Sequence, residues 1–255
     1  MRIAILYGAA IISRALAGVL SYTMQKMNGV CGLKSWQWMF LIEGSPIIPL
    51  SMITYLFLDS VPNAVQWLTN IEKQLLTNLL RDDVGLVDYN PASSTELSWR
   101  EVHYVFVDWK VYLYAFTTVG NLVVIQCLTA LFPTLIESMN YYKTDAHLMT
   151  VPPFIVACIC CLLVSYSSSC RNEHGYHVAF CLSIGLFGFI LMLTLFSQGR
   201  IAIYVGSSLA FCGILSAFPL LLSWLTNNVG GRTKRAISIS FVIGTAQIGG
   251  TVMPL

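Results

Sequence analysis

Seven apolar stretches, each long enough to cross a bilayer as a helix, constrain this 255-residue chain more than any other feature. With 56% hydrophobic and 10% charged residues, its composition is far from that of a soluble domain. Backbone groups in hydrocarbon must be satisfied within their own segment, so we expect helices. The predicted fold class is an all-α, polytopic membrane protein. The seven expected spans are 3–22, 39–58, 111–136, 148–167, 178–196, 201–225 and 236–255.

The distribution of Lys and Arg predicts the orientation, because cytoplasmic loops carry an excess of basic residues. One side collects nine of them: Arg2, Lys73, Arg81, Arg100, Lys110, Arg171, Arg232, Lys234 and Arg235. The other side has four: Lys26, Lys34, Lys143 and Arg200. We therefore expect the N-terminus in the cytoplasm and Leu255 outside. No cleavable signal peptide is evident, since the first apolar stretch reaches spanning length.

Two membrane blocks, residues 1–58 and 111–255, flank a hydrophilic segment, residues 59–110, which is the predicted cytoplasmic linker. Its first part is expected to form an amphipathic helix along the inner membrane surface, because apolar residues recur there at helical spacing. These are Val65, Leu68, Ile71, Leu75, Leu76 and Leu79. A second short helix is predicted around "STELSWREVHYVFVDWK", with Trp99 and Trp109 at headgroup level. The segment has too few core positions for a separate partner-binding domain.

No motif in the chain supports an enzyme: there is no nucleophile elbow, phosphate loop or zinc signature. Six cysteines fall within apolar stretches, where small, soft packing residues are common; they are Cys127, Cys158, Cys160, Cys161, Cys181 and Cys212. His174 and His177 lie in a short turn without a metal-binding constellation around them. We expect no metal site, no cofactor and no nucleic-acid partner.

Small residues at every fourth position predict faces on which helices approach closely. Three such rows are Ala10, Arg14 and Gly18; Ser208, Cys212 and Ser216; and Ala236, Ser240 and Gly244.

Four motifs resemble a known family. "SWQWMFLIEG", "DWKVYLYAF", "LMTVPPFIVA" followed by "VSYSSSCRNEHGYH", and "SWLTNNVGGRTKRAISISFVIG" resemble, in order and spacing, fungal members of the major facilitator superfamily. More narrowly, they are similar to the anion:cation symporter branch typified by allantoate permease and nicotinic acid transporters. The resemblance implies a partial major facilitator fold, running from the family's fifth helix to its eleventh. The first four helices and the twelfth would then be absent, as in a fragment.

The resemblance also implies a function and its partners. Full-length members would carry a small organic anion, of vitamin or ureide type, with protons by alternating access across the plasma membrane. The alternative is a non-transporting membrane protein of the same ancestry, such as a sensor, regulator or inactive relic. Two positions depart from the family pattern: Gln37 stands where Arg is usual, and Ser169-Cys170 where an Asp-Arg pair is usual.

Polar residues inside the spans are the candidate functional residues. Asn121, Gln126 and Gln247 are candidates for substrate binding, although polar residues also serve as contacts between helices. Arg14 lies mid-span, where an unpaired cation is costly, and Glu43 is the candidate partner in an intramembrane ion pair. The alternative is that Glu43, near the outer N-terminus of its helix, is stabilised by the helix dipole alone. The triplet Arg232, Lys234 and Arg235 is interpreted as a topology anchor that also contacts phosphate headgroups.

Overall fold

The computed structural model describes residues 1–57, 69, 71–72, 74–75, 99–138, 143–195 and 199–252. Every regular element within these ranges is helical, which confirms the all-α class. The elements are α1 (Arg2–Lys26), the 3-10 turn η1 (Val30–Gly32), α2 (Ser35–Gly44), α3 (Ile47–Phe57), α5 (Trp99–Val107), α6 (Trp109–Ser138), α7 (Lys143–Met149), α8 (Val151–Arg171), α9 (Gly175–Thr194), α10 (Arg200–Asn228) and α11 (Arg232–Val252).

Six stretches of the described chain are long and apolar enough to cross a membrane, where the sequence predicted seven. They are Arg2–Lys26, Ser35–Leu56, Trp109–Glu137, Ala146–Arg171, Gly175–Thr194 and Ile201–Asn228. The seventh expected span, 236–255, corresponds to α11. The described part of α11 is less apolar than the other spans because it includes Lys234, Arg235 and Gln247, and residues 253–255 lie outside the described ranges.

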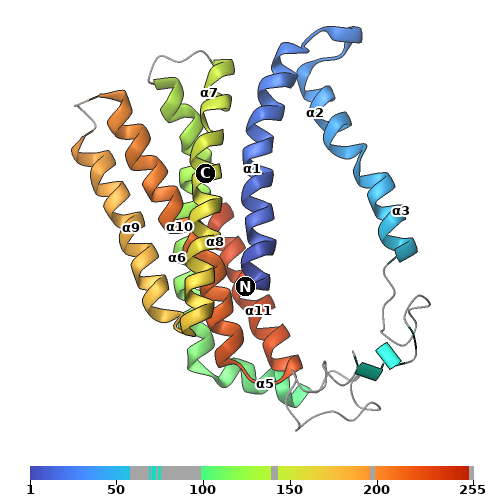
Figure 1. Ribbon diagram of the computed structural model, residues 1–255, viewed down its shortest axis with the longest axis vertical. Helices are drawn as coiled ribbons and strands as arrows, with labels where there is room; N and C mark the ends of the chain where they lie inside the picture. The colour runs from blue at the N-terminus through green and yellow to red at the C-terminus, as the bar shows by residue number, and fades with distance from the viewer. Residues whose placement is uncertain are drawn as a thin grey trace.

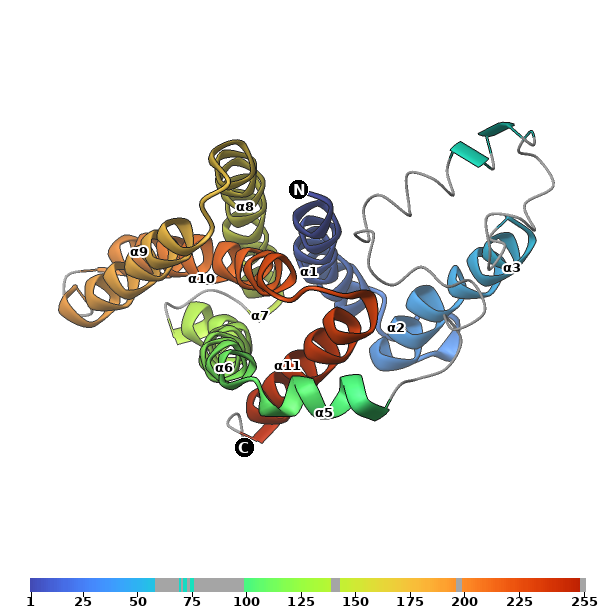
Figure 2. The same cartoon turned by 90° about the horizontal axis from the view of Figure 1, so that it is seen from below.

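α10 is the central helix of the bundle. It packs against α6, α8 and α9, and α11 lies along α6 (Figures 1 and 2). Of the most apolar part of α10, 78% is buried, more than in any other described span. Prolines lie inside two of these helices, Pro133 in α6 and Pro219 in α10.

α1 joins this bundle, whereas α2 and α3 lean away from it. The buried face of α1 consists of small and apolar residues one turn apart: Ala4, Gly8, Ile11, Ala15 and Gly18. Gly8 and Gly18 approach α8, where added Cβ atoms would meet Leu162 and Thr150. α2 and α3 extend away from the other helices (Figure 1), and none of the apolar part of 35–56 is buried.

Two of the predicted packing rows agree with the structure in part, and one is wrong. Cys212 and Ser216 of the row on α10 are buried. On α11 the predicted row of Ala236, Ser240 and Gly244 is exposed, and the buried face carries Ser238, Val242 and Ala246 instead. On α1, Ala10 is exposed although Gly18 is buried. Small residues occur on both faces of these helices, so spacing alone does not show which face meets a neighbour.

The linker predictions are tested only where the chain is described. The second predicted helix forms as α5, and both Trp99 and Trp109 are exposed, as expected for residues at a membrane surface. Of the predicted amphipathic helix over 65–79, residues 71–72 and 74–75 are helical; the rest lies outside the described residues.

Glycines allow α9 and α10 to touch through their backbones. A Cβ added to Gly188 would lie 2.5 Å from the backbone nitrogen of Ala210 and 2.8 Å from the carbonyl oxygen of Gly206. Gly213 faces Gly185 and Cys181 equally closely. This contact fixes α9 on the outer side of α10 (Figure 2).

Candidate functional site

The three residues predicted to bind substrate lie in different surroundings. Asn121 on α6 is only 5% exposed. Gln126, on the same helix, faces α11, where its Cγ is 3.0 Å from the place that a Cβ on Gly250 would take. Gln247 is exposed on α11. These positions do not define a common binding surface, and their role in substrate binding stays a prediction.

Asn121 is the most unusual of the three. Neither Nδ2 nor Oδ1 of its amide has a hydrogen-bond partner among the described residues. Asn121 lies about two turns after Tyr114 and about three turns before Phe132, so the three share one face of α6. Tyr114 and Phe132 contact rings on α10, so Asn121 faces α10 as well. A buried polar group without a partner costs about 1–3 kcal/mol, so this amide is a ready donor and acceptor inside the bundle.

Arg14 places a cationic group in the middle of α1. Its Nη1 is buried and has no hydrogen-bond partner among the described residues, and its guanidinium interacts electrostatically with Tyr7. Tyr7 in turn packs on Phe218 of α10, with ring centroids 4.8 Å apart. The apolar environment makes a lone guanidinium unfavourable by about 2.5–3.5 kcal/mol on insertion scales. Arg14 is therefore a cation that retains hydrogen-bonding capacity beside α10.

The described contacts do not support the predicted ion pair between Arg14 and Glu43. Glu43 is exposed on α2, and α2 leans away from α1 beyond their connection (Figure 1). The prediction compared only the heights of the two residues along neighbouring helices. Height says nothing about how far two helices diverge.

The predicted topology anchor lies beside α5. The Nζ atom of Lys234 lies 5.1 Å from the ring centroid of Tyr104 on α5, a cation–π contact. Nε of Arg235 donates to the carbonyl of Val229 at 3.4 Å, and the side chain is exposed. Arg232 begins α11, and its side chain is outside the described part of the structure. The contact of these cations with phosphate headgroups stays a prediction.

α5 crosses the ends of α6 and α11 (Figure 2). Phe106 meets Phe241 of α11 edge to face, with ring centroids 5.3 Å apart. Tyr112 of α6 donates a hydrogen bond from its hydroxyl to the carbonyl of Phe106 at 2.9 Å. The short amphipathic helix thus ties the beginning of α6 to the first half of α11.

A hydrogen-bond network that the sequence did not predict holds the turn between α8 and α9. His174 in this turn is 9% exposed. Its Nδ1 lies 2.7 Å from Oγ of Ser168 on α8, and its Nε2 lies 2.7 Å from Nδ2 of Asn227 on α10. Oγ of Ser168 also lies 3.1 Å from the carbonyl oxygen of Glu173, to which it donates. Burial lowers the pKa of His174 below its ordinary value of 6.5.

The end of α10 is held from the opposite side by α6. Nδ2 of Asn228 donates to the hydroxyl of Tyr114 at 2.9 Å. The ring of Tyr114 packs edge to face on Trp224, with centroids 5.2 Å apart. Gly175, directly after His174, also lies against the ring of Trp224. Trp224, Asn227 and Asn228 of the motif "SWLTNN" therefore connect the end of α10 to α6 and to the α8–α9 turn.

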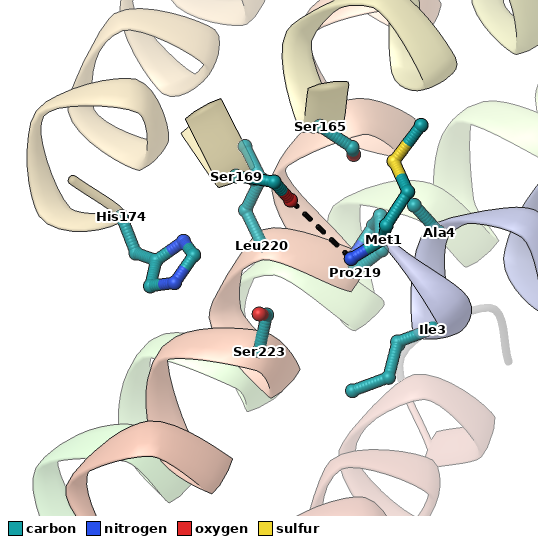
Figure 3. A pocket seen from close by; sticks show the side chains of 9 residues that line it. All are labelled: Met1, Ile3, Ala4, Ser165, Ser169, His174, Pro219, Leu220 and Ser223. Carbon is teal, nitrogen blue, oxygen red and sulfur yellow. Dashed lines mark hydrogen bonds between the residues drawn. The ribbon is translucent and has the colours of Figure 1, made fainter. Parts of the chain in front are cut away.

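A small pocket lined by both apolar and polar side chains lies next to this network, between α1, α8 and α10 (Figure 3). It is lined by Met1, Ile3, Ala4, Ser165, Ser169, His174, Pro219, Leu220 and Ser223. The amino group of Met1 donates to Oγ of Ser169 at 3.3 Å. Oγ of Ser165 is buried without a partner among the described residues. The cavity volume of about 10 Å³ suits one water molecule.

The sequence analysis missed this network because each of its residues has an ordinary explanation taken alone. A histidine in a turn and asparagines at a helix end are both common. Two features taken together could have indicated it. A run of serines precedes "NEHG", and a pair of asparagines ends another span at the same side of the membrane. Only the fold shows that these ends touch.

Comparison with known proteins identifies the family. The family model described as Major Facilitator Superfamily matches residues 1–254. The chain belongs to the Major Facilitator Superfamily. It is 27% identical over 252 residues to MFS transporter prlL from a fungal species, covering 99% of this chain and 50% of that protein. It is 28% identical over 257 residues to MFS-type transporter efuF from Hormonema carpetanum, covering 100% and 51% respectively. It is 25% identical over 253 residues to major facilitator-type transporter hxnP from Emericella nidulans, covering 98% and 50%.

Membership of the Major Facilitator Superfamily confirms the resemblance at the level of the superfamily. It makes the chain a multi-pass membrane protein with a partial major facilitator fold, from a family of transporters and not of enzymes. The chain spans about half the length of the curated relatives it matches.

Two natural cysteines test the predicted orientation of this major facilitator chain. Cys31 is exposed after the end of α1, and Cys170 is exposed near the end of α8, beside the start of α1. With the N-terminus inside, a membrane-impermeant maleimide on intact cells is expected to label Cys31 and not Cys170. Cys31→Ser should therefore remove the labelling and Cys170→Ser should leave it unchanged. The reverse pattern would place the N-terminus outside.

Proposed function

We propose that this chain is part of a proton-coupled transporter of small organic anions in the plasma membrane, working by alternating access. Superfamily membership supports transport in general. The anion specificity rests on one observation, the guanidinium of Arg14, whose Nη1 is buried without a hydrogen-bond partner inside the described bundle. A carboxylate is the natural ligand for such a group, since a guanidinium donates paired hydrogen bonds to it.

The substrate class rests on the resemblance to allantoate permease and nicotinic acid transporters, and it includes vitamin and ureide anions. Asn121 is the predicted polar residue best suited to assist, because its buried amide can both donate and accept. Gln126 and Gln247 remain weaker candidates, one packed against Gly250 and the other exposed.

Uptake measurements test this function. The longest reading frame that contains this sequence is reconstituted into liposomes, and uptake of labelled nicotinate, allantoate and pantothenate is followed with and without an inward proton gradient. We expect saturable uptake of at least one of these anions, accelerated by the gradient. Uptake that is unchanged by the gradient, or absent for all three anions, contradicts the proposal. Absence would favour the second candidate, a non-transporting membrane protein of the same ancestry.

Substitution of Arg14 by Gln tests the residue that carries the anion specificity. A hydrogen bond to a charged group contributes about 1.5–3 kcal/mol, so we expect affinity for the transported anion to fall on the order of 10- to 100-fold. Arg14→Lys should retain part of the affinity, since it keeps the charge but loses the paired donors. Arg171→Gln, at the exposed end of α8, is the matched control. Equal anion affinities in wild type and Arg14→Gln would exclude Arg14 from the site.

A further inference from the structure

The donors around His174 determine its protonation state. The amide nitrogen of Asn227 can only donate, so Nε2 of His174 accepts, at 2.7 Å. Nδ1 then carries the proton and donates to Oγ of Ser168 at 2.7 Å, and the hydroxyl of Ser168 donates a hydrogen bond to the carbonyl of Glu173 at 3.1 Å. With the Asn227 amide in this orientation, each of these donors has one acceptor only when the imidazole is neutral. This arrangement therefore requires neutral His174.

Protonation of His174 breaks this series of hydrogen bonds at one point, the contact with Asn227. A proton on Nε2 would face the amide nitrogen of Asn227, and two donors would then meet at 2.7 Å. Rotation of the Asn227 amide would restore one hydrogen bond. It would still leave an imidazolium that is 9% exposed and has no carboxylate bonded to it among the described residues. The first outcome removes the hydrogen bond between the α8–α9 turn and α10, and the second leaves a nearly buried charge without a counterion. Both therefore disfavour the closed arrangement.

We propose that His174 is a proton-operated latch, which fastens the α8–α9 turn to the end of α10 when neutral and releases it when protonated. α10 has its own attachment to α6, through Asn228, Tyr114 and Trp224, and this attachment does not involve His174. Release of His174 therefore loosens the α8–α9 turn from α10 while α10 stays attached to α6.

The charges around the latch oppose protonation. On α9, His177 faces His174, and on α1 the amino group of Met1 faces it; both act against a second positive charge. α8 and α10 face it with the uncharged groups of Ser168 and Asn227. Burial is the largest cause of the lowered pKa of His174. A histidine whose pKa is lowered in the closed state stabilises that state above its ordinary pKa, and this stabilisation is lost as the pH falls below about 6.5.

Hydrogen exchange measured on the whole chain in lipid nanodiscs tests the latch. The exchange of peptides covering residues 171–178 and 224–229 is measured from pH 5 to pH 8. Division by the intrinsic exchange rate gives the opening equilibrium of their amide groups at each pH. Below about pH 6.5 the opening equilibrium is expected to rise, by up to about tenfold per pH unit. Peptides within α6 should show no such change.

Three variants distinguish the titration of His174 from a general loosening of the protein at low pH. His174→Gln is expected to show the same opening equilibrium at every pH, since an amide can accept from Asn227 but cannot titrate. Asn227→Asp should reverse the trend, because a carboxylate accepts from a protonated imidazole and closes the latch at low pH. His103→Gln, at an exposed position on α5, should keep the wild-type profile. Constant protection of the wild type across this pH range, or an unchanged pH profile in His174→Gln or in Asn227→Asp, overturns the proposal.

Discussion

Replacing Gly213 with leucine is expected to prevent α10 from packing on α9, and the chain should not reach a stable fold. A Cβ at this position would overlap the backbone nitrogen of Gly185 and lie 2.5 Å from the carbonyl oxygen of Cys181. Both neighbours are backbone atoms of α9, so no side chain can rotate to make room. For the smaller change Gly213→Ala, we expect a loss of about 1–3 kcal/mol in the free energy of unfolding, as in other overpacked cores.

Thermal unfolding in detergent, followed with a dye that reacts with newly exposed thiols, measures this effect. The chain offers internal reporters, since Cys181 and Cys212 are buried free cysteines on the two helices concerned. Gly244→Ala is the matched control: Gly244 is also helical, and an added Cβ would meet nothing within 4 Å. That substitution should be neutral or slightly stabilising, because alanine favours helix over glycine by up to about 1 kcal/mol. Equal melting temperatures for Gly213→Ala and Gly244→Ala would disprove the close contact.

Expressed alone, the 255-residue chain is expected to show no saturable transport. Alternating access requires two helical halves that rock around a shared site near the membrane midplane. The described chain offers two spans before residue 58, and the second of these, Ser35–Leu56, has none of its apolar part buried. Uptake of nicotinate, allantoate and pantothenate by liposomes containing this chain, under an imposed proton gradient, is the measurement. We expect uptake equal to that of empty liposomes.

The exposed apolar surface of α2 and α3 suggests how such a chain behaves instead. We expect it to self-associate in the bilayer, and cross-linking in native membranes should detect the association. Two copies that complement one another are the alternative. Substrate-specific, saturable uptake that the gradient accelerates would favour complementation and would show the prediction to be wrong.

The spans could be predicted from the sequence because hydropathy over about twenty residues depends on no distant contact. For this reason the predicted and observed spans agree at six places. α11 is not among the six because Lys234, Arg235 and Gln247 lower its mean hydropathy. α5 could also be predicted, since an amphipathic pattern and flanking tryptophans are local features.

The candidate site could be predicted less well because its residues depend on how helices lie against each other. Arg14 stands out in the sequence as a cation in mid-span, but its predicted partner was inferred from height alone, and Glu43 lies exposed on a helix that diverges. The His174 network joins residues that are far apart in the sequence, and nothing local to His174 indicates that Asn227 lies 2.7 Å away.

Pro219 divides α10 into two mechanically different parts. A proline has no N–H group, so the carbonyl of Leu215 lacks its usual helical partner and the helix bends more easily there. Before this point, Phe211 is clamped between Phe132 and Phe154, with ring centroids 5.0 and 4.9 Å away. After it come Trp224, Asn227 and Asn228, which carry the contacts to the α8–α9 turn and α6. The contacts with the α8–α9 turn and with α6 therefore act on the short arm after Pro219, while the longer arm stays fixed in the bundle.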